Sequence, residues 1–211
     1  MSVYTAKEIP WKSPGGDLII RSFCSPEEIR GYSFDEQFGF HAQYKSLYTR
    51  RATLEALAAG EEANVVLALA DGSHIVGFGV LDQPDPDERW AALGKQLIME
   101  VKAIEVGRNW RSGKVAGGIL ELMLEHPRVE KMIVYMVGYS WTWDLDGTGK
   151  TALEYRNILI KLFTPLGFQE LPTNEPNVCL KAENLFMGRI GAEIPPEVEK
   201  AFKWLRFGIM P

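Results

Sequence analysis

The stretch from Arg108 to Gly117 has the residue types needed to bind an anion. It follows a strand-like run that ends in Ala103-Ile-Glu-Val106, and it leads into a helix-like segment. A strand-to-helix turn of this kind offers backbone N–H groups and a helix N-terminus to an anionic group. Arg108, Arg111 and Lys114 add cations at the same place. The alternative interpretation is a basic turn whose glycines bind nothing.

Two other patterns do not meet the requirements of a phosphate or metal site. Gly149-Lys150-Thr151 is similar to the end of a phosphate-binding P-loop, but Asp144 stands where that motif needs its first glycine. The three histidines have no ligand spacing, so we expect no metal; they are His41, His74 and His126.

Length, charge and cysteine content limit the class of protein. A chain of 211 residues predicts one large domain over 1–211, with N-terminal and C-terminal extensions packed on it. The net charge of −5 argues against a nucleic-acid partner. Cys24 and Cys179 stand far apart and form no CxxC pair, so no disulfide framework is indicated. With no signal-like or membrane-spanning apolar run, we expect a cytoplasmic protein without a membrane partner.

Hydrophobic periodicity predicts the elements that position the turn. Asp71-Gly72-Ser73 predicts a hairpin between two strands. Strands are expected over 17–23, 64–70, 74–81, 97–106, 131–137 and 184–190, and helices over 41–59, 114–125, 151–163 and 198–205. The expected class is α+β, with a mixed central sheet flanked by helices.

The turn resembles the acetyl-CoA pyrophosphate loop of the GNAT acetyltransferases, whose pattern is Gln/Arg-x-x-Gly-x-Gly/Ala. Here it reads Arg111-Ser-Gly-Lys114-Val-Ala116. Lys114 stands where the family usually has glycine, and Gly113 comes one place early. The resemblance implies the GNAT acyl-CoA N-acyltransferase fold.

A narrower resemblance, over roughly residues 16–207, is to the acetoin-utilisation acetyltransferases, GNAT proteins that acetylate AMP-forming acetyl-CoA synthetase. The matching pieces, in chain order, are 25–34, 84–90, 103–106, 141–145, 154–156, 187–191 and 205–207. This resemblance implies a protein-lysine acetyltransferase with acetyl-CoA as donor and no metal. Its cofactor-binding residues would be Val106, Arg108, Arg111, Ser112, Gly113, Lys114, Val115, Ala116 and Gly117.

Acetylation of a lysine needs a group that accepts a proton. An amine with a pKa near 10.4 is unprotonated at pH 7 about once in 2,500, a handicap of roughly 4.6 kcal/mol. Glu100 and Glu105 are the candidate bases, and their odd spacing places them on opposite faces of a regular strand. The family's base lies eleven residues before the loop's opening Gln/Arg, which favours Glu100; Glu105 is the second choice. By position in the family, the Val106 N–H would face the thioester carbonyl.

The proton donor and the acceptor site are less sharply indicated. Many GNATs have a tyrosine four residues before the Gly-Phe that follows their late helix, where this chain has Phe163, so Tyr139 or Tyr155 could substitute. A substrate-binding role is assigned to Asp85, Asp87, Glu88, Trp141 and Trp143. The acidic residues could attract the surface around a target lysine or merely be solvated, and the tryptophans could line the lysine site or belong to the core.

The sequence therefore predicts transfer of acetyl from acetyl-CoA to a protein lysine, with acetyl-CoA synthetase as the expected protein substrate. The alternatives are a non-catalytic acyl-CoA-binding regulator and an N-acetyltransferase of small amines.

Overall fold

The computed structural model describes residues 4–40 and 47–210. Contacts divide the chain into two compact units, Met1–Asp82 with Lys102–His126 and Gln83–Val101 with Pro127–Pro211. Strand β6 (Ile98–Val106) contributes residues to both units. That the whole chain is a single acetyltransferase domain stays a prediction.

In the first unit the sheet order is β1-β2-β4-β5-β6. Neighbours from β1 to β5 are antiparallel, and β3 pairs with β5 in parallel. The strands are β1 (Glu8–Ser13), β2 (Gly16–Arg21), β3 (Ser33–Phe34), β4 (Asn64–Ala70) and β5 (His74–Asp82). Asp71 and Gly72 have φ values of +50° and +73°, which confirms the predicted hairpin between β4 and β5.

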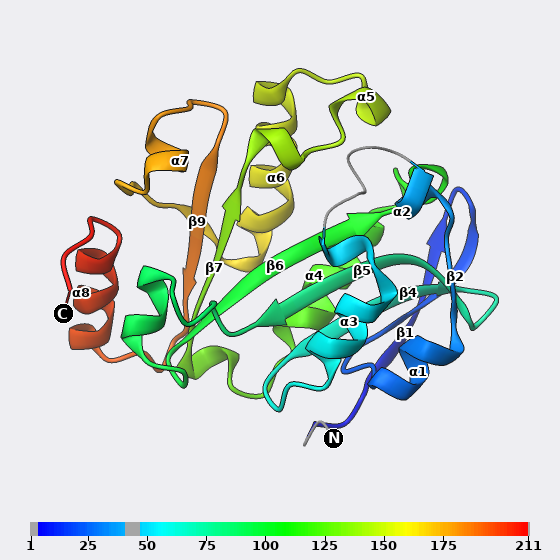
Figure 1. Cartoon of the computed structure of the whole chain (residues 1–211), viewed down its shortest axis with the longest axis horizontal. Coiled ribbons are helices and arrows are strands. Elements are labelled where there is room, and N and C mark those ends of the chain that lie inside the picture. The colour runs from blue at the N-terminus through cyan, green and yellow to red at the C-terminus, as the bar shows by residue number, and fades with distance from the viewer. Residues whose placement is uncertain (1–3, 41–46, 211) are drawn as a thin grey trace. The chain divides into compact units, whose positions relative to one another are not determined.

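Helices cover both faces of β4 and β5, which explains why every residue of β4 is buried. Val65, Leu67 and Phe78 share one face with residues of α1 (Pro26–Gly31), α2 (Gln37–Phe40) and α3 (Arg51–Ala58). The other face carries Gly79, where a Cβ would lie 2.5 Å from Ile119 Cγ2 of α4 (Val115–Leu124). Glycine there allows α4 to lie directly on the sheet, behind the strands in Figure 1.

The helix expected over 41–59 is shorter than predicted. The 3-10 helix η2 (Leu47–Thr49) is followed by Arg50 in an extended conformation, with φ −102° and ψ 126°, and α3 begins only at Arg51. Residues 41–46 of that prediction lie outside the described residues. The sequence analysis also missed β1 and α1, although Ser25 and Glu28 form a capping box at the start of α1.

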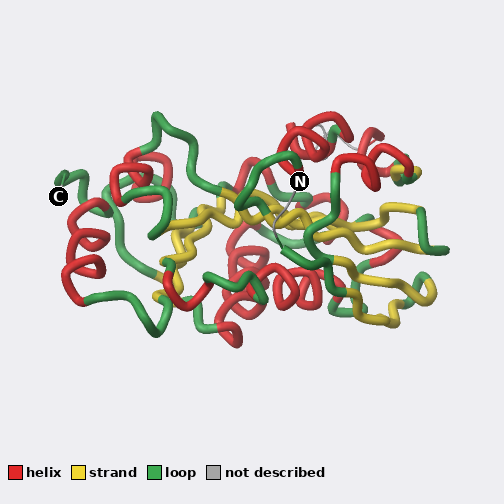
Figure 2. Tube along the Cα trace, turned by 90° about the horizontal axis from the view of Figure 1, so that it is seen from below, coloured by secondary structure: helices red, strands yellow, loops and turns green. Residues whose placement is uncertain are grey.

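In the second unit the sheet order is β6-β7-β9-β8. β6 pairs in parallel with β7 (Ile133–Gly138), and β9 (Leu185–Ile190) pairs antiparallel with both β7 and β8 (Gln169–Glu170), so the sheet is mixed as predicted. The α-helices of this unit are α5 (Leu145–Thr148), α6 (Ala152–Phe163), α7 (Pro176–Cys179) and α8 (Pro196–Leu205). Figure 2 colours the helices red and the strands yellow, and helices are seen on both sides of the strands.

An aromatic core holds α8 and the 3-10 helix η3 (Arg89–Leu93) against β6, β7 and β9. Trp90 of η3 stacks on Phe186 with ring centroids 4.7 Å apart, and Phe186 stacks on Tyr135 at 5.6 Å. The described residues also form the 3-10 helices η4 (Arg108–Trp110), η5 (Val129–Lys131), η6 (Ser140–Thr142) and η7 (Thr164–Leu166). Among the described residues, none of the helices is both long enough and apolar enough to cross a membrane.

Candidate functional site

The loop between β6 and α4 contains two non-glycine residues in the left-handed region. Ser112 has φ +71° and Lys114, the N-cap of α4, has φ +56°. No side chain of the described residues caps this helix, and its first backbone bond runs from Gly118 N–H to Lys114 O at 3.1 Å. The N–H groups of residues 115–117 therefore have no partner within the helix. This is the geometry with which a helix N-terminus binds an anion.

The β1–β2 hairpin supports the loop from the side. Trp11 Nε1 donates to Gly113 O at 2.8 Å. A Cβ on Gly113 would lie 2.7 Å from the backbone atom Ser13 Cα, closer than real Cβ atoms approach, and 3.0 Å from the side-chain atom Pro14 Cδ, a tight contact. Glycine at 113 therefore permits the contact. Sequence reasoning missed this support, although the turn residues Ser13-Pro14-Gly15-Gly16 between Trp11 and Leu18 are a hairpin signal.

Arg111 connects the loop to the end of β6. Its Nε donates to Val106 O at 3.0 Å. Gly107, which follows Val106 in the chain, donates its N–H to Val76 O at 2.9 Å. Val106 is 7% exposed. The Arg111 guanidinium therefore helps to fix the strand end, while Lys114 is exposed.

Glu100 lies at the last paired position between β6 and β7. The register runs from Ile98↔Ile133 to Glu100↔Tyr135. Because side chains alternate along a strand, Ile98 and Glu100 share one face, and paired Tyr135 shares it with them. Glu100 and Glu105 are both half-buried, and Glu105 lies beyond the segment of β6 that pairs with β7. The assignment of either glutamate as the base stays a prediction.

Carboxylates surround two phenols in the second unit. Tyr135 is fully buried, and its hydroxyl donates to Glu88 Oε2 at 3.1 Å. Burial raises the pKa of Tyr135, and the charges of Glu100, Glu88 and Asp85 raise it further. Burial also raises the pKa of Tyr139 to about 12, with contributions from Glu175, Glu88 and Glu100. Burial disfavours any charged group, phenolate and ammonium alike, but the carboxylate charges that add to the shift would attract a cation such as a lysine ammonium.

The predicted acidic loop divides into an exposed part and an inward part. Asp85 and Asp87 are exposed, whereas Glu88 is half-buried and accepts the Tyr135 hydrogen bond. The sequence analysis had no signal for Tyr135, which reads as a core residue of β7. Only the structure shows that Glu88 belongs with Tyr135 rather than with solvent.

The two tryptophans after β7 differ in environment. Residues Ser140–Thr142 form the 3-10 helix η6, so Trp141 lies in a turn and Trp143 follows it. Trp141 is 54% exposed and stacks on Tyr139 at 4.7 Å, whereas Trp143 is 8% exposed and stacks on Tyr155 at 5.2 Å. Lining of an acceptor site by either ring stays a prediction, and Trp141 is the one whose ring is accessible.

Phe163, which stands at the position of the tyrosine found in many GNATs, is 2% exposed and packs edge-on against Phe168 at 5.0 Å. No group of three or more His, Cys, Asp or Glu that could hold a metal ion occurs within residues 4–40 and 47–210.

Relatives of known name cover almost the whole chain. The chain is 32% identical over 196 residues to "Acetoin utilization protein AcuA" of Bacillus subtilis (strain 168), covering 93% of this chain and 91% of that protein. It is also 32% identical over 205 residues to the protein of the same name from Bacillus licheniformis, covering 97% and 94%. The chain belongs to the AcuA family. No family model matches it.

Solved structures agree with membership of the AcuA family. The crystal structure of an acetoin utilization protein from Exiguobacterium sibiricum 255-15 superposes with a TM-score of 0.88 at 26% identity, covering 97% of this chain and 95% of that one. An acetyltransferase of the GNAT family from Listeria monocytogenes 4b F2365 superposes with a TM-score of 0.53 at 12% identity, covering 87% and 99%. The fold is therefore that of the GNAT acyl-CoA N-acyltransferases, as predicted. AcuA membership and this fold together support an acetyltransferase, and the fold implies an acyl-CoA donor.

Proposed function

We propose that this protein transfers the acetyl group of acetyl-CoA to a lysine of a protein in the cytoplasm, with AMP-forming acetyl-CoA synthetase as the substrate. The observation that carries the proposal is that a carboxylate and an anion-binding loop stand at the two ends of one strand. β6 holds Glu100 on an acidic face at one end, and at its other end it leads into the Lys114 helix N-terminus. A proton acceptor and a diphosphate-binding loop are the two devices that this transfer needs.

The loop has the features needed to hold the pyrophosphate of acetyl-CoA. The N–H groups of Val115, Ala116 and Gly117 would donate to phosphate oxygens, and the Lys114 ammonium would neutralise charge. Gly113 keeps the loop against the β1–β2 hairpin, as its close approach to Ser13 requires. A preformed loop lowers the conformational entropy lost on binding.

In the proposed reaction the lysine amine attacks the thioester carbonyl, a C–N bond forms, and the C–S bond breaks to release the coenzyme A thiolate. Glu100 takes the proton that the amine must lose, with Glu105 as the second choice. The Val106 N–H would donate to the carbonyl oxygen as negative charge develops there. Each of these roles belongs to the proposal.

The thiolate can leave unaided or take a proton from a nearby hydroxyl. The phenol of Tyr139 has a proton to donate at neutral pH, although its pKa of about 12 makes it a weaker acid than an ordinary tyrosine. Phe163 has no proton to give. Among the described residues, this makes Tyr139 a better candidate than the helix position where many GNATs have tyrosine.

The acceptor side of the proposal depends on charge. Glu100 and Glu88, together with exposed Asp85 and Asp87, would attract a cationic lysine and a basic surface around it. The Trp141 residue is 54% exposed and its ring stacks on Tyr139, and Lys181 Nζ lies 5.1 Å from the centroid of the Trp141 ring. That internal contact supports the idea that a cation is stabilised on this ring.

The test is to incubate the protein and acetyl-CoA with three acceptors: native acetyl-CoA synthetase, the same synthetase with its active-site lysine changed to arginine, and spermidine. Mass spectrometry should find acetylation of the native synthetase alone. Acetylated spermidine with unmodified synthetase would instead indicate the small-amine enzyme. Saturable binding of acetyl-CoA without any acetylated acceptor would indicate the non-catalytic regulator.

A further inference from the structure

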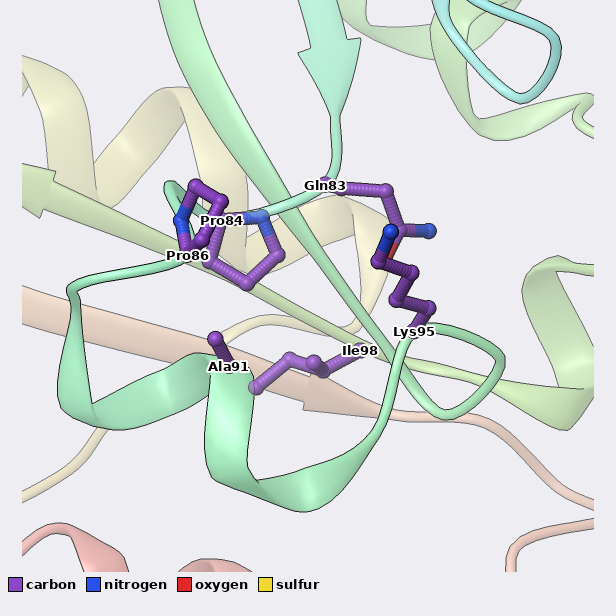
Figure 3. Close-up of a pocket in the computed structure, with 6 residues that line it drawn as sticks. All are labelled: Gln83, Pro84, Pro86, Ala91, Lys95 and Ile98. Carbon is purple, nitrogen blue, oxygen red and sulfur yellow. The ribbon is translucent and has the colours of Figure 1, made fainter.

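A pocket of about 230 Å³ lies in the second unit, between the segment that follows β5, helix η3 and the start of β6. Figure 3 shows Gln83 and Lys95 on one side, Pro84 and Pro86 on the other, and Ala91 and Ile98 below. Four of these six residues are apolar, and the two polar groups are together. The pocket therefore suits a ligand with an apolar body and a hydrogen-bond acceptor at one end.

The pocket is adjacent to the proposed base along β6. Ile98 lines it, and Glu100 is the next residue on the same face of the strand. Residues two apart on a strand are about 7 Å from each other, which is also the length of about two residues of extended peptide. A chain bound with its lysine at Glu100 would thus present a neighbouring side chain to the pocket.

The surrounding charges distinguish a polypeptide from a free small acid. Asp85 and Asp87 alternate with the two prolines of the pocket and are exposed. Glu88 and Glu100 add negative charge on the adjoining face. A small acid has no cationic group to place near these carboxylates, whereas a peptide can place a lysine ammonium near them and an apolar side chain in the pocket.

We infer that this pocket is a subsite for an apolar side chain, of leucine to phenylalanine size, close in sequence to the acetylated lysine. Lys95 and Gln83 bind a backbone carbonyl or an acidic side chain beside that residue. The inference depends on the proposed lysine acetyltransferase function, and it makes the protein selective for the residues that flank the target lysine.

The experiment uses peptides with one lysine in a glycine-serine background. Leucine is placed at each flanking position in turn, with and without a neighbouring glutamate, and kcat/KM is measured for each peptide. One position should raise kcat/KM about tenfold, since filling an apolar pocket gives discrimination of roughly 10- to 200-fold. Ala91→Leu fills the pocket, so in this variant kcat/KM for the leucine peptide should be close to kcat/KM for the glycine peptide.

Lys95→Glu provides a second variant that does not alter the apolar wall. In the native protein a glutamate beside the leucine should raise kcat/KM roughly threefold, as expected for an exposed ion pair with Lys95. In Lys95→Glu the same glutamate should instead lower kcat/KM. Lys200→Glu, on an exposed position of α8, is the matched charge control and should keep the preference. Glu100→Gln should slow the leucine and glycine peptides equally and preserve their ratio.

The outcomes separate this inference from the proposed function. Acetylation of all the peptides at one rate, or a leucine preference that survives Ala91→Leu, would overturn the subsite. If neither the peptides nor acetyl-CoA synthetase are acetylated, the proposed function itself fails. Competition by free isovalerate with the leucine peptide, but not with the glycine peptide, would show a small-acid site and would also overturn the peptide assignment.

Discussion

Substitutions at Lys114 should change stability and cofactor affinity in opposite directions. Lys114 has φ +56°, and a side chain in the left-handed region costs about 1–2 kcal/mol. Lys114→Gly removes this cost. Glycine also gives the unfolded chain more conformational freedom, which lowers the free energy of unfolding by about 0.5–1 kcal/mol. The net gain of roughly 0.5–1 kcal/mol should raise Tm by about 1–4 °C for a chain of this size.

The same substitution removes a cation from the proposed pyrophosphate site. Two unit charges 4 Å apart interact by about 1 kcal/mol in water and about 4 kcal/mol near a protein surface. With the lower value, Lys114→Gly should weaken acetyl-CoA binding about fivefold. Lys114→Glu replaces the attraction by a repulsion, so it should cost about 2 kcal/mol, or roughly 30-fold.

Calorimetry with acetyl-CoA and thermal unfolding of the free protein measure the two effects separately. Lys114→Ala should lose affinity as the glycine variant does without the gain in Tm, because alanine retains the left-handed strain. Lys150→Glu is the control, an exposed lysine beside the start of another helix, where it precedes Thr151, the N-cap of α6. If Lys114→Glu binds acetyl-CoA with an affinity within twofold of the native value, acetyl-CoA does not bind at this loop. An unchanged Tm for Lys114→Gly would refute the strain argument.

Three further predictions address the base, the acceptor and the half-buried phenol of Tyr139. Glu100→Gln should lower the rate at pH 7 by roughly 10²- to 10⁴-fold with little change in acetyl-CoA affinity; full activity would transfer the role to Glu105 or water. Asp85→Asn with Asp87→Asn should raise KM for acetyl-CoA synthetase at low salt and spare small amines, and equal losses on both acceptors would contradict docking at this loop. The pKa of Tyr139, about 12 in the folded protein, lies above the usual tyrosine value near 10, so the folded state holds this proton more tightly. Between those two values the free energy of unfolding should fall as pH rises, and the fall should be shallower in Tyr139→Phe; identical slopes in denaturant titrations would contradict the shift.

Local patterns in the sequence determine most of the fold. The alternating and continuous apolar runs predicted β2, β4, β5, β6, β7 and β9, and the periodic positions predicted α4, α6 and α8. Thr151 and Glu154 predicted the capping box that begins α6. These elements depend on interactions between residues near in sequence, and their signals are therefore readable without a structure. The failures were the missed β1 and α1 and a helix expected over 41–59, where one extended residue, Arg50, separates η2 from α3.

The candidate site depends on contacts that no local pattern encodes. The sequence placed cations and glycines at 108–117, but the reason for Gly113 is the approach of Ser13, a hundred positions earlier in the chain. Glu88 is one of several carboxylates in an acidic run, and only its hydrogen bond to Tyr135 distinguishes it from its solvated neighbours. Trp141 and Trp143 are identical in type, yet the η6 turn exposes one and buries the other. Residue type determines which chemistry is available, whereas the long-range packing that tertiary structure alone supplies decides which of those groups are buried, paired or exposed.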